Sequence, residues 1–242
     1  MFVRSFRSFE SLSSGVAKEI LRLAKEAIAE QGRFTIVLSG GNTPRTLYET
    51  LARDYATIID WQHVHIFWGD ERYVPHDDPN SNFRMAKESL LDKITIPKKN
   101  IHAIPILSNP TDSSDTYSKD LQSFFKEDVP AFDLILLGLG GDGHTASLFP
   151  GMAAEEMKSG LVIVTHSPAP PPIRISLTLQ VINNARNVFF LVSGQEKKEI
   201  LKTVLAEQRN PTTSYPAARV HPQGSLVWFV DEACSRDVPV TE

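Results

Sequence analysis

The sequence predicts an α/β protein built on a mostly parallel open sheet that is flanked by helices. Continuous apolar runs of strand length alternate along the chain with stretches of helical period, which is typical of strands buried on both faces. Several apolar runs are followed at once by glycine or charged residues, as at Ser39-Gly40-Gly41 after residues 34–38. Ligands of open α/β sheets bind beyond the carboxyl ends of strands, so these residues indicate where a site would lie.

Hydrophobic periodicity predicts the order of the elements. We expect strands over residues 2–7, 34–38, 64–68, 134–137, 161–164, 173–177, 188–192 and 226–230. We expect helices over residues 11–30, 45–53, 82–91 and 195–206. The first helix is amphipathic and ends at Gly32, and its apolar stripe comprises Leu12, Val16, Ile20, Leu23 and Ala27.

The composition fits one domain over residues 1–242. Hydrophobic residues make up 41% of the chain and charged residues 22%, which allows a sizeable core. The sequence contains no internal repeat or low-complexity segment. The proline-rich stretch 168–172 is too short to link two domains and is better interpreted as a rigid loop.

The charge balance argues against a general nucleic-acid-binding protein. The formal net charge is -4 and no long basic run occurs, although a small anionic ligand would need only a few local cations. The single cysteine, Cys234, cannot form an internal disulfide, which favours a reducing compartment and a packing role for its thiol. The N-terminal residues lack an apolar signal core, and no run approaches the ~18 residues of a membrane span. We therefore expect a cytoplasmic protein without a membrane partner.

The first candidate loop is Ser-Gly-Gly-Asn-Thr-Pro-Arg, residues 39–45. Gly40 and Gly41 would let backbone N–H groups approach a ligand, and the N-terminus of the following helix favours an anion. The alternative is a simple capped helix, with Thr43 as the N-cap and Pro44 as the first helical residue. The Gly-Lys-Ser/Thr of a P-loop is missing.

The second candidate segment is Gly-Asp-Glu-Arg-Tyr-Val-Pro, residues 69–75, which places Asp70 and Arg72 just after a strand. The alternative is a surface turn with a weak ion pair. Just before it, His63 and His65 lie two residues apart and would share one face of a strand. No third metal ligand has recognisable spacing, so a structural pair is favoured over a metal site.

The third loop, Gly-Leu-Gly-Gly-Asp-Gly-His-Thr-Ala-Ser-Leu-Phe-Pro-Gly, residues 138–151, carries the strongest signal. It satisfies G-x-G-x-x-G, but the acidic residues near the distance of a dinucleotide site, Glu155 and Glu156, have no strand before them. Asp142 and His144 stand together after the most apolar strand, as an oriented general base would. The alternative is a histidine that only caps the loop. No G-x-S-x-G elbow supports a serine nucleophile.

Scattered cations complete the candidates. Arg174 follows the proline-rich stretch, and Lys197 and Lys198 follow Ser193-Gly194. Each alone is more typical of a solvated surface charge, so their value depends on whether they converge.

Together these motifs resemble the 6-phosphogluconolactonase family. The resemblance covers nearly the whole chain in order, and it rests on residues 39–44, 68–75, 81–82, 133–151, 170–178, 193–201 and 215–220, with Trp228 and Asp231. It implies a Rossmann-like fold similar to those of glucosamine-6-phosphate deaminase and ribose-5-phosphate isomerase, with no metal and no organic cofactor. The deaminases need a further carboxylate in the histidine loop. Residues 147–150 here supply none, which favours the lactonase.

The resemblance also implies roles. His144 would activate water for attack on the lactone of 6-phosphogluconolactone, with Asp142 holding its ring. The oxyanion would be bound by backbone N–H groups either of Gly40 and Gly41 or of the loop 140–143; the sequence does not decide between them.

The remaining residues would bind the substrate. Arg72, Arg174 and Lys197 are expected to hold the phosphate, with Lys197 preferred to Lys198. Asp70 and Asn82 would hold sugar hydroxyls or orient Arg72. The substrate site would also include Asn42, Thr43 and Gly141. The alternatives are another sugar-phosphate enzyme such as a deaminase, or a non-catalytic sugar-phosphate sensor, which an additional DNA-binding segment would favour. A monomer or small homo-oligomer is expected.

Overall fold

A seven-stranded parallel sheet forms the centre of the molecule, with the strand order β1-β10-β9-β6-β2-β3-β5. The structure is a computed structural model, and it describes residues 1–208, 210, 212–236 and 238. The strands of the large sheet are β1 (Phe2–Phe6), β2 (Phe34–Leu38), β3 (Val64–Trp68), β5 (Ile101–His102), β6 (Leu134–Gly138), β9 (Asn187–Val192) and β10 (Ser225–Asp231).

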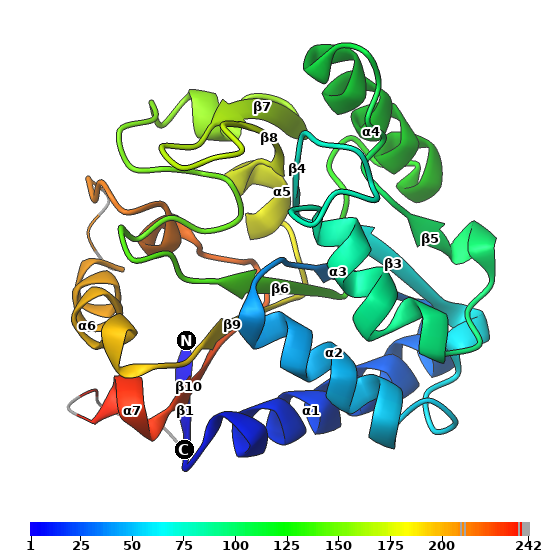
Figure 1. Ribbon diagram of the computed structural model, residues 1–242, viewed down its shortest axis with the longest axis horizontal. Coiled ribbons are helices and arrows are strands. Elements are labelled where there is room, and N and C mark those ends of the chain that lie inside the picture. The colour runs from blue at the N-terminus through cyan, green and yellow to red at the C-terminus, as the bar shows by residue number, and fades with distance from the viewer. Residues whose placement is uncertain (209, 211, 237, 239–242) are drawn as a thin grey trace.

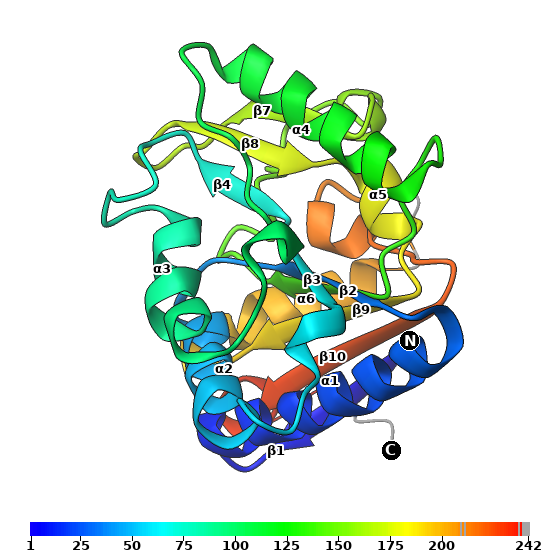
Figure 2. The same cartoon turned by 90° about the vertical axis from the view of Figure 1, so that its right-hand side faces the viewer.

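A second, three-stranded antiparallel sheet has the order β4-β8-β7. Its strands are β4 (Asp70–Arg72), β7 (Val162–His166) and β8 (Ile173–Leu177). The helices are α1 (Phe9–Gln31), α2 (Asn42–Asp54), α3 (Asn82–Ser89), α4 (Pro110–Phe125), α5 (Leu179–Asn183), α6 (Lys198–Glu207) and α7 (Glu232–Ser235). Figures 1 and 2 show α1 and α2 on one side of the large sheet, and the small sheet with α4 on the other.

The predicted fold class is confirmed, because the large sheet is parallel and flanked by helices. Helix α1 is longer than predicted because Ser8 and Ser11 form a capping box, and Gly32 ends it in the left-handed conformation with φ 75°. The apolar stripe of α1 is buried, as expected: Leu12, Val16, Ile20, Leu23 and Ala27.

The structure departs from the expected pattern in the small sheet. The predicted strands at 161–164 and 173–177 form, as β7 and β8, but they pair with each other in antiparallel fashion. A parallel pair needs a crossover of about a dozen residues or more, and the proline-rich loop between them is too short for one. No element was predicted at β4, β5 or α4, because β4 and α4 are largely polar and β5 has only two residues.

The core is continuous across the sheet and rich in aromatic residues. Trp228 of β10 stacks on Phe190 of β9, with ring centroids 3.8 Å apart and planes within 4°. Both side chains are fully buried, so this pair fixes the register of two central strands. Among the described residues, no helix is both long and apolar enough to cross a membrane.

The expectation that His63 and His65 share a strand face is wrong. His63 lies in the 3₁₀ turn Trp61–His63, where its Nδ1 is 2.7 Å from Asp60 Oδ2. His65, on β3, instead meets His102 of β5, with 3.1 Å between Nδ1 and Nε2. The turn forms because the Asp60 side chain caps it, so the strand begins only at Val64.

The His65–His102 pair lies among aromatic rings and cations. His102 stacks on Phe67 with ring centroids 4.3 Å apart and also contacts the Phe124 ring. Burial and the neighbouring His65 lower the pKa of His102 to about 4. Burial, then the charges of Arg33, Lys99 and His63, lower the pKa of His65.

The lowered pKa of His102 predicts loss of stability in acid. As pH falls below 6.5, the unfolded chain takes up a proton that the folded protein takes up only near pH 4. The contribution of His102 to the free energy of unfolding is therefore fully present above pH 6.5 and declines toward pH 4. We expect His102→Phe, which keeps a stacked ring, to reduce the decline between pH 7 and pH 5 by about 1 kcal/mol, after allowing for solvent screening. Urea unfolding at both pH values measures it, with the exposed His221→Phe as control. An unchanged pH dependence in His102→Phe would contradict the prediction.

Candidate active site

A cleft of about 340 Å³ opens at the carboxyl ends of β2 and β6, in the middle of the large sheet. This is the edge at which the sequence analysis expected a site. The structure brings most of the predicted residues to it. Those lining the cleft are Gly40, Gly41, Asp70, Arg72, Asn82, Gly141, His144, Arg174 and Lys197.

The first loop enters the cleft through its backbone. Gly41 has φ 106° and ψ 173°, a conformation open essentially to glycine alone, and it is the N-cap of α2. Among the described residues, the N–H groups of Gly40 and Gly41 have no hydrogen-bond partner, and no side chain caps the helix. The cleft therefore meets an uncapped helix N-terminus, which favours a negatively charged group.

Two expectations for this loop are wrong. Thr43 is not the N-cap and Pro44 is not the first helical residue, because Gly41 turns the chain into the helix two residues earlier. Asn42 and Thr43 do not line the cleft. Asn42, the first residue of α2, is exposed.

The second segment is a strand rather than a surface turn. On β4, Asp70 and Arg72 face the cleft, and Glu71 between them points to the opposite side, as strand alternation requires. Glu71 is 1% exposed, and its carboxylate accepts the N–H groups of Asn82 and Phe83, each at 2.7 Å. Burial raises the pKa of Glu71 to about 7. Glu71 was not predicted as a functional residue. The usable signal was its place between Asp70 and Arg72, because strand alternation puts it on the opposite, buried side.

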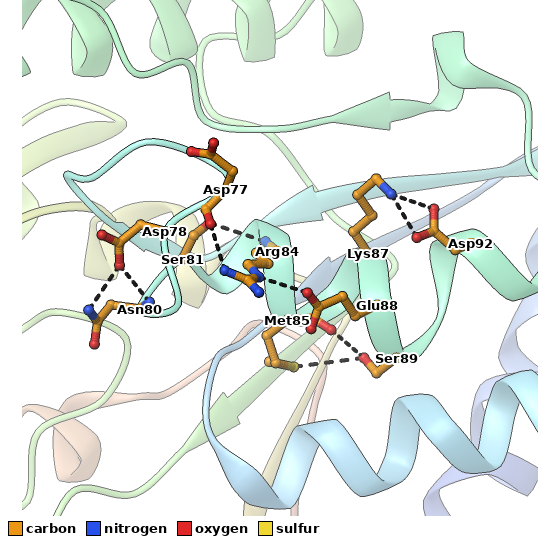
Figure 3. A network of polar contacts seen from close by, with 10 residues as sticks. All are labelled: Asp77, Asp78, Asn80, Ser81, Arg84, Met85, Lys87, Glu88, Ser89 and Asp92. Carbon is orange, nitrogen blue, oxygen red and sulfur yellow. Dashed lines mark hydrogen bonds and ion pairs between the residues drawn. The ribbon is translucent and has the colours of Figure 1, made fainter.

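Surface contacts shape the loop that runs from β4 to α3, as Figure 3 shows. Asp78 accepts hydrogen bonds from both nitrogens of Asn80, and Arg84 donates to Glu88 and to the carbonyl of Asp77. Ser81 caps α3 by accepting the N–H of Arg84 at 3.1 Å. As a result, the first residue of α3, Asn82, lies at the cleft.

Asp70 and Asn82 hold each other. The Asn82 amide donates to the Asp70 carbonyl oxygen at 2.9 Å, and its oxygen lies against Gly40, where a Cβ would come within 2.0 Å. The Ser147 hydroxyl donates to Asp70 Oδ2 at 2.7 Å, which joins the second segment to the third loop. Ser147 also lines the cleft, and the sequence analysis did not assign it a role.

Asp142 and His144 form an oriented pair in the third loop. Asp142 Oδ1 lies 2.6 Å from His144 Nδ1 and accepts the backbone N–H of His144 at 3.1 Å. Partial burial alone would raise the pKa of Asp142, but the contacts with His144 hold that pKa below its ordinary value. Asp142 stands behind the ring and does not line the cleft, which leaves Nε2 of His144 for chemistry.

Glycines and a later segment support the ring of His144. A Cβ on Gly140 would lie 2.1 Å from His144 Nδ1, so the ring can rest there only because the residue is glycine. Gly143 has φ 84° and is covered by the ring of Tyr215, and its carbonyl accepts the N–H of Ala217. The position of the loop that carries the ring thus depends on a segment more than 70 residues away, which no local pattern in the third loop could have revealed.

The predicted cations converge. Arg72 and Arg174 are directly opposite each other in the β4–β8 ladder, and Lys197 reaches the cleft from the 3₁₀ turn Gln195–Lys197. Burial and the charge of Arg72 lower the pKa of Arg174. Within the described part of the chain, none of the three forms a salt bridge. Such a cluster of like charges is suited to an anion. Lys198 does not line the cleft, in agreement with the preference for Lys197.

Arg72 is not oriented by Asp70 or Asn82, which was one of the roles considered for them. Its Nη1 donates instead to the carbonyl of Asn80 at 2.7 Å, and its buried Nε has no partner among the described residues. Over the same residues, no group of three or more His, Cys, Asp or Glu side chains is placed to hold a metal ion.

Comparison with known proteins identifies the family. The family model for glucosamine-6-phosphate isomerases and 6-phosphogluconolactonase matches residues 7–228. The chain belongs to this family. It is 46% identical over 217 residues to a 6-phosphogluconolactonase from Synechocystis sp., covering 88% of each chain. It is 44% identical over 225 residues to one from Nostoc sp., covering 91% of each.

Solved structures agree with the fold. The 6-phosphogluconolactonase of Thermotoga maritima has a TM-score of 0.83 at 32% identity, with 95% of this chain and 99% of that chain covered. A monomeric glucosamine-6-phosphate deaminase, at 21% identity, has a TM-score of 0.83 over 98% and 99% of the two chains and shows the shared fold alone. The predicted likeness to deaminases is confirmed; the likeness to ribose-5-phosphate isomerase stays a prediction.

The contacts of Glu71 predict a large loss of stability on its replacement. In Glu71→Gln, the amide NH₂ faces N–H donors that the carboxylate accepts, which leaves buried donors unpaired. We expect the free energy of unfolding to fall by about 2–3 kcal/mol. Denaturant unfolding measures it. Glu88→Gln, which breaks the exposed pair with Arg84, should change stability little. Equal effects in the two variants would argue against this role for Glu71.

Proposed function

We propose that this protein hydrolyses 6-phospho-D-glucono-1,5-lactone to 6-phospho-D-gluconate, a step of the oxidative pentose phosphate pathway. The names of its relatives agree with the activity that the sequence motifs predicted. The observation that carries the proposal is one cleft lined both by His144, which Asp142 orients, and by cations that have no carboxylate partner among the described residues. The first supports attack by water, and the second supports recognition of a phosphate.

His144 is the general base. With Nδ1 engaged by Asp142, Nε2 accepts a proton from water, whose oxygen adds to the C1 carbonyl of the lactone. Asp142 stabilises the imidazolium that results. When the bond between C1 and the ring oxygen breaks, the imidazolium returns the proton to that oxygen. The products are the acid and a regenerated His144.

Backbone N–H groups stabilise the oxyanion at C1. In the third loop, the N–H of Gly140 donates to the His144 carbonyl and that of Gly143 to the Gly140 carbonyl. Among the described residues, the N–H groups at the cleft that remain without partners include those of Gly40, Gly41 and Gly141. These are the donors available to the oxyanion or the phosphate.

The 6-phosphate is held by Arg72, Arg174 and Lys197. Arginine provides a bidentate fork and lysine a compact charge, and all three line the cleft without carboxylate partners among the described residues. Asp70, buried and fixed by Ser147, is suited to accept sugar hydroxyls. Binding energy at the phosphate then positions C1 beside His144.

Two alternatives are less well supported. A deaminase needs a further carboxylate in the histidine loop, where this chain has Ser147, whose hydroxyl is committed to Asp70. A sensor would not need the oriented Asp142–His144 pair. Within the proposal, the chain acts as one domain over residues 1–242, in the cytoplasm, as a monomer or small homo-oligomer, without metal, organic cofactor or nucleic acid.

Removing the base should abolish most of the activity. We expect His144→Ala to lower kcat by about 10²-fold or more while the thermal unfolding midpoint changes little. The measurement is a coupled assay on freshly generated 6-phosphogluconolactone, corrected for spontaneous hydrolysis. A folded His144→Ala enzyme with most of its kcat would exclude His144 as the base.

A methyl group beneath the ring should also impair turnover. In Gly140→Ala, the new Cβ would overlap the ring of His144. Displacing the base from its near-attack position should lower kcat by about 10-fold or more. The same assay compares the variant with the wild type. A folded Gly140→Ala enzyme with a kcat close to that of the wild type would show that the ring position is not critical.

Loss of a phosphate anchor should be specific to the phosphorylated substrate. A charge-assisted contact contributes about 1.5–3 kcal/mol, so Arg174→Ala and Lys197→Ala should each lower kcat/KM for 6-phosphogluconolactone by about ten- to more than hundredfold. The weak hydrolysis of unphosphorylated gluconolactone should barely change, and inorganic phosphate should inhibit the variants less than the wild type. Equal losses on both lactones would show that the two residues are not phosphate anchors.

A further inference from the structure

A buried carboxylate outside the cleft holds the turn that carries Lys197. Asp231, the last residue of β10, is 6% exposed and does not line the cleft. Its Oδ2 accepts the hydroxyl of Ser193 at 2.6 Å and the N–H of Gly194 at 3.1 Å. Its Oδ1 accepts the N–H of Cys234 at 3.0 Å, which caps α7, and lies 3.3 Å from the same N–H of Gly194. Oδ2 is therefore the nearer acceptor for the turn, and Oδ1 is the acceptor for α7.

The turn continues this chain of contacts to Lys197. Gly194 has φ 101°, and a Cβ there would lie 2.5 Å from the carboxylate oxygens of Glu196, so only glycine fits. The carbonyl of Gly194 accepts the backbone N–H of Lys197 at 3.0 Å. Gly194 thus links the two residues: its N–H is bound by Asp231, and its carbonyl accepts the N–H of Lys197.

We propose that Asp231 is a positioning residue that fixes the Ser193–Lys197 turn so that the Lys197 ammonium reaches the substrate anion. A lysine stem has many rotamers, so where its charge lies depends on where its backbone is held. Among the described residues, the Lys197 ammonium forms no salt bridge that would hold it in place. The inference rests on the proposed function, since it takes the phosphate of the sugar lactone as the anion.

Asp231→Asn is the informative substitution, because Oδ2 makes the shorter contact with Gly194 whereas Oδ1 caps α7. An asparagine oriented to accept the Cys234 N–H keeps the α7 cap and the longer 3.3 Å contact with Gly194, but its NH₂ replaces the nearer acceptor of that N–H. We expect kcat/KM for 6-phosphogluconolactone to fall about tenfold, mainly through KM, with little change for unphosphorylated gluconolactone. Inorganic phosphate should inhibit this variant more weakly than the wild type. In the double variant with Lys197→Ala, the loss should equal that of Lys197→Ala alone.

Two further variants separate positioning from general destabilisation. Ser235→Ala removes a buried hydrogen bond to the Asp231 carbonyl, and a contact with Ser5, without touching Gly194. It should leave the ratio of the two lactone activities unchanged. Ser193→Ala removes one bond from Oδ2 and should give a smaller, about threefold, loss on the phosphorylated lactone only. It serves in place of Asp231→Asn if that variant does not fold.

The outcomes are distinguishable. Equal losses on both lactones, or losses that add to that of Lys197→Ala, would overturn the role of Asp231 while leaving the proposed function intact. A wild-type enzyme that handles both lactones equally would instead overturn the proposed function. A selective, non-additive loss in Asp231→Asn or Ser193→Ala, with an unchanged ratio in Ser235→Ala, supports the inference.

Discussion

The hydrogen bonds of the buried Glu71 carboxylate are the contacts on which the cleft depends. By accepting the N–H groups of Asn82 and Phe83, this carboxylate joins β4 to the start of α3. Strand alternation then directs its neighbours Asp70 and Arg72 into the cleft, and the helix start delivers Asn82 beside them. A carboxylate buried at this position is costly unless it is hydrogen-bonded, and the donors that satisfy it are the same groups that begin the helix.

The sequence predicted those features that are local. The runs predicted as strands at 34–38, 64–68 and 173–177 coincide with β2, β3 and β8. Each is a short apolar run bounded by turn residues, which is typical of a buried strand. The Asp142–His144 pair was found because its two members lie in one turn. By contrast, β4 is polar and becomes a strand only by pairing with β8, about 100 residues later in the chain. The roles of Ser147 and Asp231 were missed for the same reason, since their partners Asp70 and Gly194 are distant in sequence.

The cations of the cleft show how function is favoured over stability. Arg72 and Arg174 are held opposite each other by strand register, and the charge of one lowers the pKa of the other. Arg72 donates to the carbonyl of Asn80 and Arg174 to the carbonyl of Pro171, and among the described residues neither forms a salt bridge with a carboxylate. Their net positive charge is therefore left for a ligand, and an anion that binds between them relieves a repulsion present in the free protein.

The hydrogen bond between Ser147 and Asp70 has a consequence for how ligands enter. It ties the histidine loop to the small sheet, so the two walls of the cleft cannot separate without breaking a buried contact of 2.7 Å. A ligand thus enters a cleft whose two walls are already joined, and less chain entropy is lost on binding than if the walls had first to be brought together.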